Sequence, residues 1–468
     1  MKTARIITLM LLLLCGKLNA QSSKFDKWQT PGFFHGYNMT DWDNQDERDV
    51  YPSDFVKLKS IGANLVDIQI EGLWEVDPPY RKHIWWAEDG DTTFYIEILD
   101  NMVRYARSAG LMYVITIRTG PGRIDVSDEE NESSIWTNRE EQLLYASMVK
   151  RMITPFVEDS LFVGVDPLIE PNPLFLLDDG EPTIPAAKQA FEDAGIDVNA
   201  LYTLLIDSIR TVSEDLPIMV EGPYFSDPEY FGLVDKQKDP YIVYKVHLYN
   251  PAEFTHAEEN WSVTYPGTYF SIRLQEERRF DRSFLEQELY RPVLEFQNRY
   301  QVPVFVGEMG VSRPQHGAMK FLRDISSIAC IHGWHYAFWG FNDGPEFNYW
   351  DMDSLYGTRY VPVIERLMSC EPITSDIDRK EDNDIVAYPN PSGDILHIRL
   401  GSKATADSAL RFYNALGAEV TSNISCIREG GDVRADVSVL PPGVYSIFIR
   451  EAPNQRAIII KWVAGSPR

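Results

Sequence analysis

Two glutamates follow directly on apolar runs that are typical of buried strands. Glu170 comes after the run 162–169, and Glu308 comes after the run 302–307. A carboxylate that ends such a strand is costly inside a core, but it can project into a cleft from the rim of a parallel sheet. Two facing carboxyl groups suit the hydrolysis of a glycosidic bond, in which one donates a proton and the other, ionised, attacks or activates water. Either glutamate alone would equally suit a salt bridge at the rim, so the interpretation depends on the pair.

The elements that must position these glutamates alternate between strand and helix from about residue 33 to about residue 370. Strands separated by helices pair in parallel, and eight such units predict a closed (β/α)8 TIM barrel, an α/β fold. The ends of the fourth and seventh strands, and with them the two glutamates, then face one another across one barrel mouth. The predicted strands are 33–36, 65–70, 113–117, 162–169, 217–221, 241–248, 302–308 and 334–339. The predicted helices are 54–60, 94–108, 138–157, 198–213, 284–300, 318–332 and 361–369.

Several short segments, in the same order along the chain, resemble glycoside hydrolase family 5, the cellulase-like family of clan A. Segment 162–173 resembles the family's fourth strand, and 303–310 resembles its nucleophile strand. His247-Leu248-Tyr249 resembles the His-x-Tyr of strand six, and Trp339-Gly340-Phe341 resembles the tryptophan of strand eight. The matches span residues 33–370.

The resemblance implies a retaining enzyme that cleaves β-linked glucans or mannans. Glu170 would be the acid/base and Glu308 the nucleophile. His247 and Tyr249 would orient these two carboxyl groups, and Trp339 would stack under the sugar at the cleavage point. On its own, a histidine such as His247 is more often purely structural.

The chain departs from the family pattern at three positions. Ile169 stands where the family has an asparagine that binds the hydroxyl beside the reacting carbon, a contact worth about 2–4 kcal/mol in the transition state. Asp67 replaces the usual arginine of strand two, and Arg118 replaces the usual histidine of strand three. One hypothesis is that Arg118 pairs with Asp67 and brings the missing cation to Glu308, and the alternative is an ordinary ion pair in the barrel mouth.

These departures leave a second class of function open, a catalytically weak barrel that binds glycans without hydrolysing them. Retention of both glutamates argues against it, because a pure binding protein needs neither. Hydrolysis of another chemistry is disfavoured, because the sequence has no Gly-x-Ser-x-Gly elbow.

Other aromatic residues follow predicted strands and are candidates for contact with sugar. Trp74 follows the second strand, Tyr224 the fifth and Trp350 the eighth. The acidic run 41–47 hints at calcium, but it lacks the glycine and terminal glutamate of an EF-hand loop and fits a solvated loop better. We therefore expect no cofactor and no metal.

Composition and charge limit the partners. The chain of 468 residues is 44% hydrophobic and carries a formal net charge of −26. A chain this acidic repels nucleic acid and anionic lipid, so we expect neither as a partner. The length suits one barrel and one small domain, and we expect a monomer that acts on a polysaccharide or oligosaccharide.

The domain organisation is read from composition. Residues 1–20 predict a secretory signal peptide, with Lys2 and Arg5 before a short apolar stretch. Cys15 raises lipidation as an alternative, but the residue before it is Leu14 and not a small one. The barrel is expected over 21–371 and a polar linker over 372–384. No later stretch predicts a transmembrane segment.

The remaining residues, 385–468, predict a small all-β sandwich. Tyr388-Pro389-Asn390-Pro391, the strand and turn at 413–417, and the segment 440–445 resemble the type IX secretion sorting domain of Bacteroidetes. The resemblance implies export by the type IX secretion machinery and a protein that is secreted or attached to the outer-membrane surface. A carbohydrate-binding sandwich is the alternative, but no aromatic strip supports it.

Three cysteines follow the predicted signal peptide, Cys330, Cys370 and Cys426. The first two fall on neighbouring predicted helices, so a Cys330–Cys370 disulfide is a hypothesis and three buried thiols are the alternative. No CxxC pair is present to suggest a zinc site.

Overall fold

The computed structural model forms two compact units, each of which is described by itself. The described residues of the first unit are 24–40, 50–72, 93–123, 134–173, 182–257, 263–312, 315–341 and 368. Those of the second unit are 386–388, 394–399, 409–414, 418–429, 432–441, 443–450 and 458–464. The predicted signal peptide, the predicted linker, the acidic run 41–47, Trp74, Trp350 and the helix 361–369, apart from Met368, lie outside these ranges.

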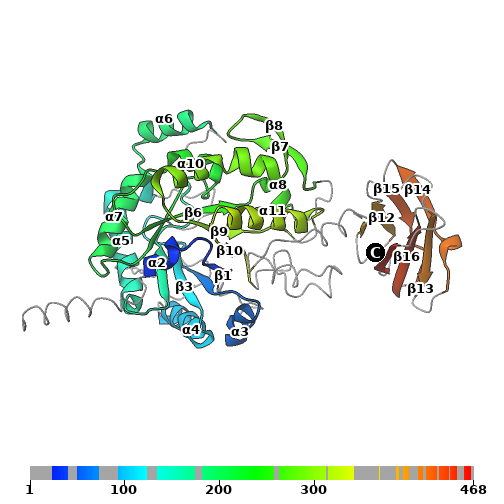
Figure 1. Ribbon diagram of the computed structural model, residues 1–468, viewed down its shortest axis with the longest axis horizontal. Coiled ribbons are helices and arrows are strands. Elements are labelled where there is room, and N and C mark those ends of the chain that lie inside the picture. The colour runs from blue at the N-terminus through cyan, green and yellow to red at the C-terminus, as the bar shows by residue number, and fades with distance from the viewer. Residues whose placement is uncertain are drawn as a thin grey trace, which may run out of the picture. The chain divides into compact units, whose positions relative to one another are not determined.

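The first unit is a closed parallel barrel in which every strand of the predicted series is present (Figure 1). Around the barrel the order is β1-β2-β3-β4-β5-β6-β9-β10, and β10 pairs with β1 to close it. This confirms the TIM-barrel prediction. The strands are β1 (His35–Thr40), β2 (Leu65–Ile70), β3 (Met112–Ile117), β4 (Phe162–Asp166), β5 (Ile218–Glu221), β6 (Ile242–Leu248), β9 (Val304–Met309) and β10 (His335–Phe338).

Helices surround the barrel and begin and end at residues with recognisable capping roles (Figure 1). The Asn138 side chain accepts hydrogen bonds from the first turn of α5, and Asp197 does the same for α7. Gly195, with φ of +70°, ends α6. The helices are α3 (Pro52–Ser60), α4 (Thr93–Ala109), α5 (Arg139–Ile153), α6 (Ile184–Ala194), α7 (Val198–Arg210), α10 (Arg291–Tyr300) and α11 (Ala318–Ile331).

Two predicted elements are shorter than expected, and proline explains both. The fourth strand ends at Asp166 and not at residue 169, because Pro167 has no N–H to continue the ladder. The single helix predicted over 284–300 is divided into α9 (Arg282–Phe284), a π-turn (Leu285–Leu289) and α10, which begins with Pro292 in its first turn.

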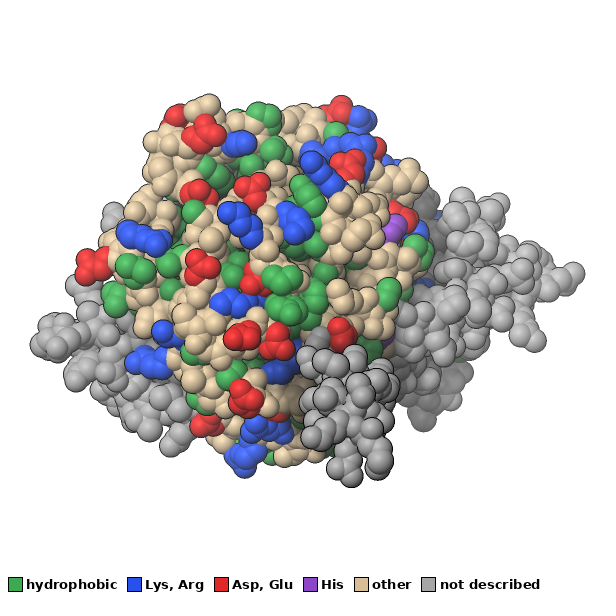
Figure 2. Space-filling view, turned by 60° about the vertical axis from the view of Figure 1, so that its left-hand side comes forward, with side chains coloured by type: hydrophobic (Ala, Val, Ile, Leu, Met, Phe, Trp, Pro, Cys, Tyr) green, Lys and Arg blue, Asp and Glu red, His purple; other side chains and the backbone are tan. Residues whose placement is uncertain are grey.

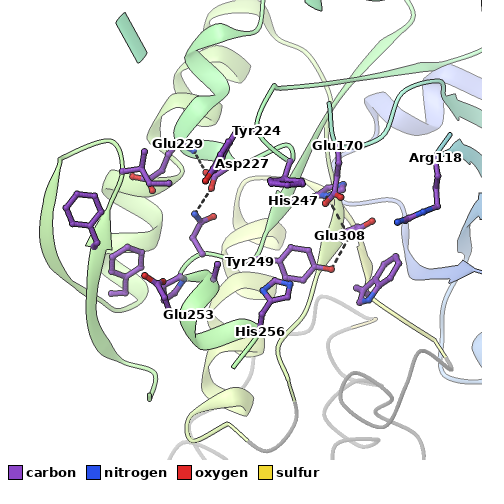
Figure 3. A pocket seen from close by; sticks show the side chains of 18 residues that line it. Arg118, Glu170, Tyr224, Asp227, Glu229, His247, Tyr249, Glu253, His256 and Glu308 are labelled. Atoms are coloured by element: carbon purple, nitrogen blue, oxygen red, sulfur yellow. Dashed lines mark hydrogen bonds and ion pairs between the residues drawn. The ribbon is translucent and has the colours of Figure 1, made fainter. Parts of the chain in front are cut away.

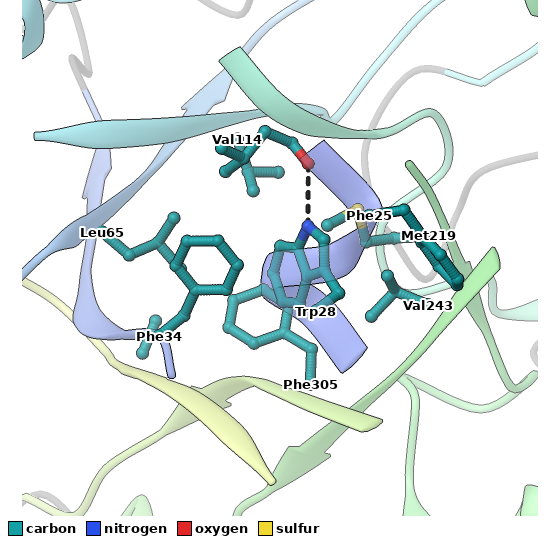
Figure 4. Close-up of a cluster of buried hydrophobic side chains, with 10 residues drawn as sticks. Phe25, Trp28, Phe34, Leu65, Val114, Met219, Val243 and Phe305 are labelled. Carbon is teal, nitrogen blue, oxygen red and sulfur yellow. Dashed lines mark hydrogen bonds between the residues drawn. The ribbon is translucent and has the colours of Figure 1, made fainter. Parts of the chain in front are cut away.

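The end of the barrel at the amino ends of its strands is closed by a helix that the strand–helix alternation did not predict. Helix α2 (Lys24–Gln29) places Trp28 in a buried cluster with apolar residues from the barrel, where its ring contacts Phe34 and Phe305 (Figure 4). The indole Nε1 donates a 2.8 Å hydrogen bond to the Val163 carbonyl, which satisfies the only polar atom of the buried ring. The buried cluster comprises Phe25, Trp28, Phe34, Leu65, Val114, Val163, Met219, Val243, Phe305 and Ala337.

A β-hairpin follows β6 where the alternation predicted none. Strands β7 (Gly267–Ser271) and β8 (Glu276–Phe280) pair only with each other. None of the described helices is long and apolar enough to cross a membrane. Basic and acidic side chains are interspersed over the part of the described surface in Figure 2.

The second unit consists of two antiparallel sheets, as expected for a small β-sandwich. One sheet has the order β11-β12-β15-β14 and the other β13-β16-β17. Inward residues such as Leu396, Phe412 and Ile447 are fully buried in its core. The strands are β11 (Val386–Tyr388), β12 (Ile395–Arg399), β13 (Ala409–Asn414), β14 (Ser425–Glu429), β15 (Asp432–Asp436), β16 (Gly443–Arg450) and β17 (Ile458–Ala464).

The cysteines agree in part with the disulfide hypothesis. Cys330 is disulfide-bonded, and Cys426 is a free thiol. Cys370 lies outside the described residues, so the Cys330–Cys370 pairing stays a prediction.

Candidate active site

A cavity of about 600 Å³ opens at the carboxyl ends of the barrel strands and is lined by 18 residues (Figure 3). Six of the seven residues predicted for the site line this one cavity, and Trp74 lies outside the described residues. The six are Arg118, Glu170, His247, Tyr249, Glu308 and Trp339. Tyr224 also lines it.

The two glutamates approach each other across the cavity. Carboxylate oxygens of Glu170 and Glu308 and a ring nitrogen of His247 all lie within 4.8 Å of one another. Carboxyl groups about 5–5.5 Å apart suit attack by one carboxylate on the sugar itself, whereas about 6.5–9.5 Å leaves room for an intervening water. The spacing therefore fits direct attack.

His247 bridges the two carboxylates. Its Nδ1 lies 2.7 Å from Glu170 Oε1 and 3.7 Å from Glu308 Oε2. Burial lowers the pKa of His247, but the nearby carboxylates of Glu308 and Glu221 outweigh burial and raise the pKa well above its ordinary value. The protonated imidazole is therefore favoured, and it lies between the two carboxyl groups.

The backbone of Glu170 has a left-handed conformation, with φ of +47°, which is strained for a residue with a side chain. Two buried side chains hold it. Glu221 Oε2 accepts a 2.6 Å hydrogen bond from the Glu170 N–H, and Arg123 donates to the carbonyls of Glu170 (3.1 Å) and Ile169. The carboxyl group is thus aimed by its own backbone.

Glu308 is held by two neutral donors. Gln69 Nε2 donates to Glu308 Oε1 at 2.6 Å, and the Tyr249 hydroxyl donates to Oε2 at 3.0 Å. Burial raises the pKa of Glu308 to about 7, while the charge on His247 opposes the shift and that on Glu170 adds to it.

The hypothesis that Arg118 pairs with Asp67 is wrong. Arg118 Nη1 donates to Gln69 Oε1 at 2.7 Å, and its Nε lies 3.8 Å from Glu71. Arg118 therefore acts on Glu308 through the Gln69 amide, whose oxygen it fixes so that the NH2 group must face the carboxylate.

The cation that pairs with Asp67 is Lys245, which sequence analysis did not identify. Lys245 Nζ lies 2.6 Å from Asp166, 3.2 Å from Glu221 and 3.3 Å from Asp67, and all four side chains are fully buried. The lysine stem crosses Gly307, where an added Cβ would lie 1.7 Å from Lys245 Cε. Glu221 connects this cluster to the site, because its Oε1 also lies 3.5 Å from His247 Nε2.

Burial and neighbouring charges shift the ionisation of this cluster. Burial raises the pKa of Asp166 well above its ordinary value, and Glu221 adds to the shift. Burial lowers the pKa of Lys245, but Asp166, Asp67 and Glu221 more than reverse this and keep the ammonium charged.

Ile169 does not supply the contact that the family's asparagine makes. Its side chain is fully buried and has no hydrogen-bonding atom to offer a sugar hydroxyl. The site gains rigidity from Arg123 and Glu221 behind Glu170, but no described residue takes over the role of the amide at position 169.

The same carboxylate, imidazole and carboxylate form a group that could hold a metal ion. A protonated imidazole has no lone pair for a metal, so the raised pKa of His247 favours a proton in this place.

We expect Gln69→Leu to lower kcat/KM by about 10- to 100-fold, because a hydrogen bond to a charged group contributes about 1.5–3 kcal/mol. Arg118→Ala should lower it by less, because the amide can still donate to Glu308. Steady-state kinetics of both variants test this order, and a larger loss in Arg118→Ala would contradict the relay through Gln69.

The barrel and the two opposed glutamates at its mouth place the protein in the class of barrel glycoside hydrolases. The sequence profile described as Cellulase (glycosyl hydrolase family 5) matches residues 25–344, so the chain belongs to glycosyl hydrolase family 5. Residues 386–461 match the secretion system C-terminal sorting domain, so the protein is secreted or attached to the cell surface.

Individual relatives agree with this assignment. Endoglucanase C of Acetivibrio thermocellus is 30% identical over 134 residues, which cover 24% of this chain and 39% of the relative, so the match spans less than half of the relative's length. The crystal structure of endoglucanase Cel5A from Thermotoga maritima is 19% identical and covers 74% of this chain and 99% of its own, with a TM-score of 0.53. Cellulose synthase subunit Z from Clostridioides difficile is 17% identical and covers 72% and 98%, with a TM-score of 0.51. These structural likenesses show the fold alone.

Proposed function

We propose that the protein is an extracellular retaining glycosidase that cleaves β-linked glucans or mannans. The observation that carries the proposal is the approach of Glu170 and Glu308 to within 4.8 Å in one cavity, with His247 between them. The spacing suits a carboxylate that bonds directly to the sugar.

The reaction has two displacements. Glu308 attacks the anomeric carbon while Glu170 gives its proton to the glycosidic oxygen, so the C–O bond to the leaving sugar breaks and a glycosyl ester forms. Water then attacks the same carbon, Glu170 takes the proton from it, and the ester oxygen returns to Glu308 as carboxylate. Two inversions give net retention.

A panel of β-glucans and β-mannans, followed by NMR of the first product formed, tests the proposal. We expect release of the β-anomer from at least one polymer. Release of the α-anomer would contradict direct attack by Glu308.

The buried Ile169 favours a second candidate, a barrel that binds glycans but hydrolyses them poorly. Binding measured by calorimetry without release of reducing ends, under conditions where the barrel is folded, would support this candidate over the first.

The pKa of Glu308 predicts the pH dependence. The nucleophile must be ionised, and its pKa is raised to about 7, so the active fraction falls as the pH drops through this value. We expect kcat/KM to fall about tenfold per pH unit below 7, and roughly 100-fold by about pH 5. A profile that stays flat down to about pH 5, measured on protein shown to be folded by circular dichroism, would contradict an ionised Glu308 nucleophile of raised pKa.

A further inference from the structure

Glu221 is a buried carboxylate that reaches the catalytic groups from outside the cavity. It is the last residue of β5, it is 1% exposed, and it is not among the described residues that line the cavity. Burial raises the pKa of Glu221, but the charges of Lys245 and His247 outweigh burial and lower the pKa below its ordinary value. The group is therefore ionised, and neither displacement step uses it.

One oxygen of Glu221 holds the backbone of the acid/base. Oε2 accepts a 2.6 Å hydrogen bond from the N–H of Glu170, whose φ is +47°. The N–H of Glu221 donates to the Tyr202 hydroxyl of α7 at 3.0 Å, and this hydroxyl donates to the Leu168 carbonyl at 3.0 Å. Tyr202 thus ties Glu221 to the segment that leads into Glu170, and a carboxylate held in this way can keep a strained backbone in place.

The other oxygen of Glu221 faces His247. Oε1 lies 3.5 Å from His247 Nε2 and 3.2 Å from Lys245 Nζ. Nε2 is buried and makes no hydrogen bond to any other described residue. A carboxylate in this place favours a proton on Nε2, because an N–H is attracted to the negative charge and a lone pair is repelled by it.

The second ring nitrogen of His247 meets the acid/base directly, because Nδ1 lies 2.7 Å from Oε1 of Glu170. In a neutral imidazole with its proton on Nε2, Nδ1 is an acceptor and would take the O–H of the acid at this oxygen. In the imidazolium, Nδ1 is a donor, so Oε1 accepts and the carboxylic proton of Glu170 must be on Oε2. The charge on His247 therefore decides which oxygen of Glu170 can give its proton to the glycosidic oxygen.

Only one of the carboxyl groups around His247 keeps its charge throughout the reaction. The titratable groups that face the ring are Glu170 after β4, Glu221 of β5, Tyr249 after β6 and Glu308 of β9. Glu170 gains and loses a proton, and Glu308 loses its charge when it becomes an ester. Burial lowers the pKa of the neighbouring His256, so this second histidine is mainly neutral at about pH 7. The constant partner of the imidazolium is therefore Glu221.

We infer that Glu221 is a positioning residue for catalysis, which fixes the backbone of Glu170 and keeps His247 doubly protonated, so that the acid proton of Glu170 lies on Oε2. The inference rests on the proposed function, because it takes Glu170 as the acid/base.

Glu221→Gln tests the inference through the basic limb of the pH profile. Glutamine keeps the size and an oxygen for the Glu170 N–H, but it has no charge, so the imidazolium loses its proton at lower pH. We expect the basic limb of kcat/KM to move to lower pH by at least about one unit and kcat at about pH 7 to fall about 10- to 100-fold. A purely structural role would lower the melting temperature and kcat without moving this limb.

Asp239→Asn is the matched control. Asp239 accepts a 2.9 Å hydrogen bond from the Tyr241 N–H and pairs with Arg210 at 2.6 Å, so it is also a carboxylate that holds a backbone N–H and a cation. It precedes the amino end of β6, whereas His247 lies near the carboxyl end. We expect this variant to be less stable and to keep the basic limb of the wild-type protein.

Nitrogen NMR of protein labelled at histidine tests the inference without activity. The signals of His247 are those that disappear in His247→Gln. We expect both ring nitrogens of wild-type His247 to be protonated at about pH 7, and the imidazole in Glu221→Gln to lose its proton at lower pH than in wild type.

A neutral His247 in the wild-type protein at about pH 7, or an unmoved basic limb in folded Glu221→Gln, would overturn the inference. If Glu221→Gln does not fold, the NMR measurement on the wild-type protein decides alone. If no β-glycan is hydrolysed, the proposed function fails, and the NMR titration of both proteins still supports or overturns the link between Glu221 and His247.

Discussion

Replacement of Glu308 by glutamine is expected to lower kcat by at least about 10⁴-fold, because removal of a nucleophile abolishes the covalent route. The side chain keeps its size, its amide oxygen can still accept the hydrogen bond from Gln69, and its NH2 group can donate to the Tyr249 hydroxyl. Steady-state rates on an aryl β-glycoside measure the loss. Glu192→Gln, which changes an exposed glutamate of α6, is the matched control and should be fully active.

The stability of this variant separates a catalytic carboxylate from a structural one. The pKa of Glu308 is raised to about 7 from 4.5, so its ionised form is disfavoured in the folded state and costs stability at any pH above the unfolded value. Glutamine carries no charge, so the melting temperature at about pH 8 should be unchanged or higher. A rim salt bridge predicts the opposite, and a variant that is both less stable and fully active would contradict the catalytic role.

The alternation of strands and helices was enough to predict the barrel and a shared mouth for Glu170 and Glu308, whereas the other site residues were assigned through the resemblance to the family. Residues at strand ends share the mouth of a parallel barrel, and this rule depends only on the order of the elements. The insertions were not predictable in the same way. The β7–β8 hairpin and α6 are inserted between the alternating strands and helices without changing the order of the barrel strands. A prediction based on alternation alone therefore does not include them.

The error over Arg118 has a geometric cause. Asp67, Gln69, Thr116 and Arg118 all point into the barrel because they alternate along β2 and β3. Which of them meet depends on the stagger between the strands, and the structure pairs Thr116 with Asp67 and Arg118 with Gln69. The alternation can be read from the sequence, but the stagger follows from barrel closure and cannot.

The position of Lys245 within a buried strand is a feature of the sequence that could have identified it as part of a charge cluster. A lysine stands within the fully buried strand Ile242–Leu248, and a buried lysine requires carboxylate partners. Asp67 stands within β2, and Asp166 and Glu221 are the last residues of β4 and β5, yet only the folded barrel shows that the four meet.

Lys245→Met is the second substitution from which we expect a large effect. Loss of the ammonium group leaves Asp67 and Glu221 buried without their cation, and breaking a buried charge cluster of this kind costs about 3–5 kcal/mol of folding stability. We also expect kcat to fall about 10- to 100-fold, because Glu221 holds the Glu170 N–H and faces His247. Thermal unfolding and steady-state kinetics measure the two effects, and Lys188→Met, at an exposed position of α6, is the matched control.

The pH profile distinguishes a positioning role from simple loss of stability. The charge of Lys245 lowers the pKa of Glu308, so its removal raises this pKa further and moves the acid limb of kcat/KM to higher pH. Gly307→Ala is a second test of the position of Lys245, because its methyl group would displace the lysine stem without removing any charge. A less stable Lys245→Met protein with an unchanged acid limb would show that the buried lysine supports the fold alone. A shifted limb would show that this chain compensates for the arginine missing from strand two with a cation from strand six.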